Sequence, residues 1–204
     1  GLPVGNWDLM GYNTNPPQHM GAYMKMKYGT WVSEIPTITT PGTYTLNPLT
    51  SATNNAYKIP SPNSTNEFFI VEYRKRDGTF ESALPGEGLL VYRINSSYYG
   101  NAGGPPDEVY IYRPGGTPSS DGSVGSAPFS SNSGRTLIND TSDPSSFLTD
   151  GSPGGLDIYN VTAIGPTMSF DVDFESPPLI TLINPQTGPG GATVTISGDH
   201  FSPV

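Results

Sequence analysis

The side chains that most often hold transition metals are scarce in this sequence. The chain of 204 residues has no cysteine and only two histidines, His19 and His200. A zinc site of the His-Glu-x-x-His type needs two histidines four positions apart on one helix face, with the glutamate as general base. Neither histidine belongs to such a motif, and without cysteine there is neither a thiolate site nor a disulfide framework. We therefore expect no zinc ligands in this chain, and we expect His19 to be a hydrogen-bonded structural residue rather than a ligand.

Hard oxygen ligands are concentrated in one loop, which makes calcium the metal to consider there. Asn139, Asp140, Asp143 and Asp150 follow one another in a stretch rich in serine and threonine. Calcium binds roughly six to eight oxygens, often with backbone carbonyls among them. The spacing is not that of an EF-hand, and Asx-turns account for the same residues. Calcium binding and simple turn formation are therefore both interpretations of this loop.

Charged residues also fall on predicted strands whose faces are largely apolar. Glu72 lies in the segment 67–74, where Arg74 follows on the same face, and Arg93 lies in the segment 88–94. A buried carboxylate needs a partner, because an isolated charge is costly to remove from water. We predict a structural pair between Glu72 and Arg93, in preference to a catalytic role for the carboxylate.

Aromatic side chains form the last group that could serve a binding function. If exposed together they would make a flat platform for a ligand, and if buried they would be ordinary core residues. The residues concerned are Trp31, Tyr98, Tyr99, Tyr110 and Tyr112.

The first element that must position these groups is a tight turn over residues 5–13. Gly5 and Asn6 tolerate positive φ, which a sharp bend requires. The turn carries Trp7 and Met10, whose apolar area is too large to leave in solvent. We expect this turn to pack beneath another part of the protein.

A short helix is predicted directly after the turn. Pro17 suits a first helical position, Asn13 or Asn15 can cap the helix, and Gly29 offers a left-handed stop. The apolar face has helical spacing and comprises Met20, Tyr23, Met24 and Tyr28.

From residue 35 onward the pattern changes from helical to alternating, which indicates a domain boundary and short strands. The region 115–133 is dense in Gly and Ser and predicts a long mobile loop. Short strands separated by turn signals, with almost no helix, predict a mainly β protein built as an antiparallel β-sandwich. The predicted strands cover residues 43–46, 56–59, 67–74, 88–94, 108–113, 156–161 and 168–174.

Composition narrows the class of partners. The formal net charge is -9, so nucleic acid and anionic membranes are disfavoured as partners. No run of eighteen apolar residues occurs, so we predict no membrane span. The chain has 25 Gly and 22 Pro residues, a content close to that of disordered sequences. The aromatic content of 11% nevertheless favours a folded, turn-rich domain.

Four segments, taken in order, resemble a known family. They are GNWDLMGYN at 5–13, PPQHM at 16–20, EFFIVEYR at 67–74 and LPGEGLLVYRI at 84–94. Together they are similar to the immune inhibitor A family of secreted bacterial zinc metallopeptidases, over roughly residues 4–174. In metzincin-like proteases a methionine turn lies beneath the metal, and the resemblance places Met10 in that turn.

The end of the chain resembles a second family. The segments LITLINP at 179–185 and GPGGATVTISG at 188–198 are similar to the opening strands of an IPT/TIG immunoglobulin-like repeat. The resulting domain organisation has three parts. Residues 1–34 are the Met-turn and C-terminal helix of an incomplete metallopeptidase domain, residues 35–176 are the β-sandwich, and residues 177–204 are a truncated Ig-like β-hairpin.

These resemblances imply a C-terminal, non-catalytic portion of a secreted or cell-surface bacterial zinc endopeptidase. Zinc and the His-Glu-x-x-His motif would come from an upstream catalytic domain of the same protein, which would be the partner of this chain. Proteins or peptides would be substrates of the parent enzyme, and this chain alone should be inactive. The alternative is an extracellular β-sandwich that binds carbohydrate or a surface and has no protease activity.

Overall fold

The computed structural model describes residues 3–174, 179–185, 187–191 and 193–199. His200 and the boundary predicted at residues 176–178 lie outside the described residues. The chain divides into two compact units, Gly1–Asp173 and Phe174–Val204. The fold is mainly β and antiparallel, as the alternating pattern predicted, with two short α-helices among the described residues.

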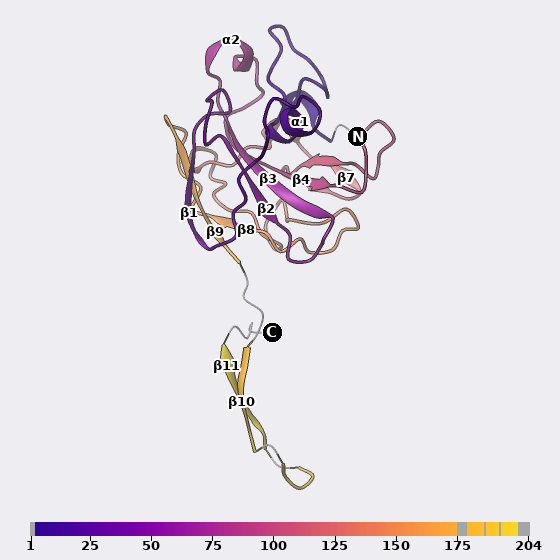
Figure 1. Cartoon of the computed structure of the whole chain (residues 1–204), viewed down its shortest axis with the longest axis vertical. Helices are drawn as coiled ribbons and strands as arrows, with labels where there is room; N and C mark the ends of the chain where they lie inside the picture. Colours follow the sequence, from indigo (N-terminus) through magenta and orange to yellow (C-terminus); the bar gives the residue numbers. More distant parts are fainter. Residues whose placement is uncertain (1–2, 175–178, 186, 192, 200–204) are drawn as a thin grey trace. The chain divides into compact units, whose positions relative to one another are not determined.

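A four-stranded antiparallel sheet forms the centre of the first unit (Figure 1). Its strand order is β2–β3–β4–β5, with Val71 of β3 opposite Val91 of β4. Every residue of β4 is buried, and most of β3 is buried too, because both faces of the sheet are covered. The bounds are β2 Ala56–Pro60, β3 Glu67–Arg74, β4 Gly88–Asn95 and β5 Val109–Ile111.

A three-stranded sheet of order β1–β9–β8 makes the second layer of this sandwich-like fold. Its strands are β1 Gly42–Leu46, β8 Asp157–Tyr159 and β9 Met168–Asp173, and Figure 1 shows β1 and β9 side by side. Burial alternates along β9, as expected for a strand with one face on a core. Tyr73 of β3 donates a hydrogen bond to the carbonyl oxygen of Gly165 at 2.8 Å, which joins the central sheet to the turn before β9.

The opposite face of the central sheet is covered by the N-terminal segment. This segment contains the 3-10 turn η1 Gly5–Trp7 and the helix α1 Ala22–Lys27. Trp7 and Tyr23 belong to one buried apolar cluster with residues of β3, β4 and β5, such as Ile70. The predicted β-sandwich therefore carries the predicted turn and helix as a layer of its core.

The region predicted as a long loop contains regular structure. It holds the two-stranded hairpin of β6 Gly116–Thr117 and β7 Ser120–Asp121, and the 3-10 turns η2 Val124–Ser126 and η3 Ser131–Ser133. Phe129 is fully buried and pairs with Leu89 of β4 through two backbone hydrogen bonds. A short helix, α2 Gly78–Glu81, was also not predicted, since only turn signals mark its sequence.

Gly88 at the start of β4 occupies a position that demands glycine. Its φ is +141°, and a Cβ there would lie 2.5 Å from the carbonyl oxygen of Phe129. We expect Gly88→Ala to lower the free energy of unfolding by about 1–3 kcal/mol, measured by urea denaturation. A Cβ at Gly103 would meet no atom within 4 Å, so Gly103→Ala is the matched control. Equal unfolding midpoints for the two variants would refute this assignment.

The second unit contains one antiparallel hairpin, β10 Leu179–Asn184 paired with β11 Thr195–Asp199. Its apolar side chains at Ile180, Leu182, Ile183 and Ile196 are all exposed. The hairpin itself was predicted, and an isolated two-stranded hairpin buries too little apolar area to be stable alone.

Candidate functional site

The turn that carries Met10 is fixed by one buried carboxylate. Asp8 accepts hydrogen bonds from the backbone N–H of Met10 at 2.8 Å and from that of Gly21 at 2.6 Å. Trp7 is buried, and its indole N–H donates to the carbonyl oxygen of Val124 at 2.6 Å. The turn is thus held from two sides, by the segment leading into α1 and by η2.

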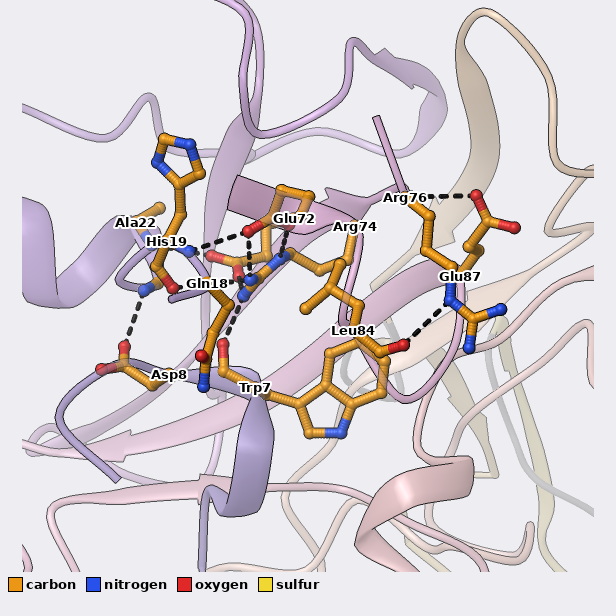
Figure 2. A network of polar contacts seen from close by, with 12 residues as sticks. Trp7, Asp8, Gln18, His19, Ala22, Glu72, Arg74, Arg76, Leu84 and Glu87 are labelled. Carbon is orange, nitrogen blue, oxygen red and sulfur yellow. Dashed lines mark hydrogen bonds and ion pairs between the residues drawn. The ribbon is translucent and has the colours of Figure 1, made fainter. Parts of the chain in front are cut away.

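Beneath the turn lies a buried network centred on Arg74 (Figure 2). Arg74 donates to the carbonyl oxygen of Trp7 at 2.6 Å and to the carboxylate of Glu72 at 3.1 Å. Its Nε and Nη2 atoms donate to the two carboxylate oxygens of Glu81 at 2.8 and 2.9 Å. All three charged side chains are fully buried. This bidentate geometry is the strongest form of the arginine–carboxylate contact.

The carboxylates of this network also cap helix α1. Glu72 accepts the backbone N–H of Ala22 at 2.7 Å, and the Tyr92 hydroxyl donates to the same oxygen at 2.9 Å. A helix leaves its first N–H groups without intrahelical partners. Here Asp8 accepts the N–H of Gly21, Glu72 of β3 accepts that of Ala22, and the Tyr92 hydroxyl of β4 accepts that of Tyr23 at 3.3 Å. The prediction that the helix begins near Pro17 with an asparagine cap is therefore wrong.

The predicted pair between Glu72 and Arg93 is also wrong. Arg93 lies 3.2 Å from the carboxylate of Glu67, while Glu72 pairs with Arg74. The register explains the error, because Arg93 stands opposite Phe69. Residues 69 and 72 are an odd number of positions apart, so their side chains point to opposite faces of the sheet.

Two buried carboxylates, Glu72 and Glu81, pair with Arg74, and the buried carboxylate of Asp8 interacts with the charges of Glu72 and Arg74. Burial raises the pKa of Asp8, and nearby Glu72 adds to that rise, whereas its hydrogen bonds to Gly21 and Met10 oppose it. Burial lowers the pKa of Lys25, which lies close to the same carboxylates. The residues of the network therefore influence one another's pKa values in addition to holding one another in place.

His19 touches this network through its backbone only. Its N–H donates to Glu81 at 2.9 Å, while its ring makes an edge-to-face contact with Phe80 and points away from Arg74 (Figure 2). Burial lowers the pKa of the imidazole, and the charge of Lys25 lowers it further. The ring is therefore biased toward its neutral form.

Met10 itself lies on the surface. Its side chain is 67% exposed, although Trp7 in the same turn is only 1% exposed. The expectation that the whole turn is packed away thus holds for Trp7 and fails for Met10. Met10 lines a largely apolar cavity of about 510 Å³, together with Val4, Met24 and Tyr99. Tyr99 is 83% exposed, so a large apolar area remains uncovered at this face.

Glu108 is one of the polar residues in the cavity wall. It accepts hydrogen bonds from the hydroxyls of Tyr23 at 2.8 Å and Tyr28 at 2.6 Å, and from Lys27. Burial alone would raise the pKa of Glu108, but the bonds from Lys27, Tyr28, Gly100 and Tyr23 outweigh it and lower the pKa. Glu108 thereby ties α1 to β5 beside the cavity.

The four candidate calcium ligands each have another partner. Asn139 and Asp150 form Asx-turns with the N–H groups of Thr141 and Ser152. Asp140 accepts the N–H groups of Gly154 and Gly155, and Asp143 accepts that of Gly115. Within the described part of the chain, no three His, Cys, Asp or Glu side chains gather as a metal site requires. These bonds account for the four side chains as turn-forming and loop-bracing residues.

The five candidate aromatic residues do not form one platform. Tyr110 and Tyr112 are buried, and only Trp31, Tyr98 and Tyr99 are exposed. The ring of Tyr99 meets that of Tyr28 at an interplanar angle of 81°, so these two rings are not coplanar.

Comparison with known proteins leaves the family open. No protein-family model matches the chain, and no curated protein or solved structure matches it significantly. None of the helices described is long and apolar enough to cross a membrane.

Proposed function

We propose that this chain is the C-terminal, non-catalytic portion of a secreted zinc-dependent endopeptidase. Its role is to support the catalytic domain of the same protein, and the reaction of the parent enzyme is peptide-bond hydrolysis. The metal and the general base would belong to the catalytic domain, as the resemblance implies.

The observation that supports the proposal is that the Met10 turn has a fixed backbone but an exposed methionine side chain. The backbone of Met10 is fixed by buried Asp8, yet its side chain is left exposed beside an apolar cavity. Exposed Met10 and exposed Tyr99 line the same apolar cavity, and a contiguous apolar surface of this kind marks an interaction site. Another domain would cover the methionine there, as the resemblance implies for a Met-turn.

Methionine oxidation tests whether Met10 is covered in the native secreted protein. In the present chain we expect peroxide to oxidise Met10 much faster than Met168, which is fully buried. In the native protein the rate at Met10 should fall toward that of Met168. If Met10 reacts equally fast in both proteins, no domain covers it and the proposal is wrong.

The substitution Met10→Ala tests whether Met10 stabilises the present chain or serves the contact with the catalytic domain. Met10→Ala should change the free energy of unfolding of the present chain by less than about 0.5 kcal/mol, because the side chain is exposed. The same substitution in the native protein should lower the rate of casein hydrolysis. A large loss of stability in the present chain would show that Met10 serves this unit alone.

A further inference from the structure

A second cavity lies away from Met10, where β4 and β5 meet the loops at their ends. Its volume is about 270 Å³. Arg93, Tyr110 and Arg113 line it on one side, and Asp107, Phe147 and Thr149 line it on others. The volume is just below the roughly 300–1,000 Å³ typical of ligand pockets, so it suits a small molecule or one end of a peptide.

The register of the central sheet brings the two key donors together. Arg93 of β4 stands directly opposite Tyr110 of β5, so both side chains project from the same face. The guanidinium of Arg93 lies 5.2 Å from the centre of the Tyr110 ring, and that of Arg113 lies 4.4 Å from it. Two cations therefore flank one aromatic ring, in a chain that has only 9 Lys and Arg residues against 18 acidic ones.

One of these two donors has no partner. Among the described residues, the buried hydroxyl of Tyr110 makes no hydrogen bond. Arg93 is partnered, because its Nε lies 3.2 Å from the carboxylate of Glu67 and its Nη1 donates to the carbonyl oxygen of Phe147 at 3.4 Å. Buried polar groups are nearly always hydrogen-bonded in folded proteins, so the Tyr110 hydroxyl points to a partner supplied by a ligand.

We propose that this cavity binds a small monocarboxylate, such as the C-terminal carboxylate of a short peptide, at Arg93 and Tyr110. A carboxylate can accept a hydrogen bond from the Tyr110 hydroxyl, and its negative charge is attracted to the guanidinium groups of Arg93 and Arg113 beside that ring. Phe147 supplies an apolar wall for the rest of the ligand. Asp107 and Asp121 also line the cavity, and their charge opposes a dianion such as phosphate.

Binding of N-acetyl-alanyl-alanine to the present chain tests this site, with the matching C-terminal amide as control. The acid and the amide have the same shape, so only the acid offers the carboxylate. Titration calorimetry should detect the acid and show at least about tenfold weaker binding of the amide, because a hydrogen bond to a charged group is lost. Equal affinities would show that the site does not recognise the carboxylate, and no binding of either peptide would show that solvent alone fills the cavity; either result overturns the proposal.

The substitution Tyr110→Phe tests whether the acid binds at the Tyr110 hydroxyl. It keeps the ring between the two arginines and removes the hydroxyl, so binding of the acid should weaken about tenfold. The urea midpoint should not fall, since the hydroxyl has no partner to lose among the described residues. Tyr159→Phe, on β8 and outside the cavity lining, is the control. Unchanged affinity in Tyr110→Phe would overturn the proposal.

Discussion

Replacing Arg74 by methionine is expected to lower the free energy of unfolding by about 3–5 kcal/mol at pH 7, a large fraction of the total stability of a typical domain. The substitution removes the cation that faces Glu72 and Glu81, and both carboxylates would remain buried without a charged partner. It also deprives the carbonyl oxygen of Trp7 of its donor. Urea denaturation followed by tryptophan fluorescence measures the loss, because Trp7 lies directly on the network.

Arg76→Met is the matched control for this prediction. Arg76 lies two residues further along the chain, is exposed, and donates to the carbonyl oxygen of Leu84 at 2.9 Å. Its replacement should cost no more than about 1 kcal/mol. If Arg74→Met does not fold, Arg74→Lys keeps the charge without the bidentate geometry and should still fold with reduced stability. Similar losses for Arg74→Met and Arg76→Met would contradict a central role for the network.

Replacing Glu108 by glutamine is expected to lower the free energy of unfolding by about 2–3 kcal/mol at pH 7. The carboxylate receives bonds from Tyr23, Lys27 and Tyr28, and glutamine retains only one of its two acceptor oxygens. Helix α1 should then become loose over β5, which amide hydrogen exchange in residues 22–27 would detect.

The effect of this substitution should depend on pH in a defined direction. The folded-state pKa of Glu108 is lowered, so its stabilising contribution is present above the unfolded value of 4.5 and is lost as pH falls through the folded pKa. The difference in stability between the native chain and Glu108→Gln should therefore shrink as the pH falls below about 4.5. Glu34→Gln, at an exposed position, is the matched control for the loss of one carboxylate. A difference that stays constant down to pH 3 would contradict the assigned charge.

The ionisation of Asp8 should change the stability with pH in the direction opposite to that of Glu108. Its folded-state pKa is raised, so the stability linked to its protonated form is present below the unfolded value of 3.8 and is lost as pH rises through the folded pKa. The hydrogen bonds that Asp8 accepts from the backbone of Gly21 and Met10 favour its ionised form and oppose this rise of the pKa.

The strands of the central sheet could be predicted from local pattern, but their pairing could not. Apolar runs bounded by turn residues indicate β3 and β4, whose observed bounds lie close to the predicted ones. The partner of Glu72 depends on the register between these strands, and alternation within each strand does not set that register. Arg74, on the same face as Glu72, was the available signal for the true pair.

In the N-terminal segment, the helix cap and the exposure of side chains likewise depend on contacts that are distant in sequence and could not be predicted from local pattern. Helix α1 begins at Ala22 because acceptors from Asp8 and Glu72 meet its first N–H groups, and these contacts span up to fifty residues of sequence. A local cap such as Asn13 is the only kind that sequence reveals. Likewise the size of Met10 predicts burial, but only the three-dimensional arrangement places Trp7 inside and Met10 outside.

Zinc content and casein hydrolysis of the native secreted protein, measured with its intact mass, test the central claim most directly. The proposed function predicts a native chain that extends upstream through a His-Glu-x-x-His helix, carries bound zinc and cleaves casein, with loss of activity on chelation. A native protein that starts near Gly1, carries no zinc and leaves casein intact would contradict it. The carboxylate site at Arg93 and Tyr110 would then remain as an independent function to test.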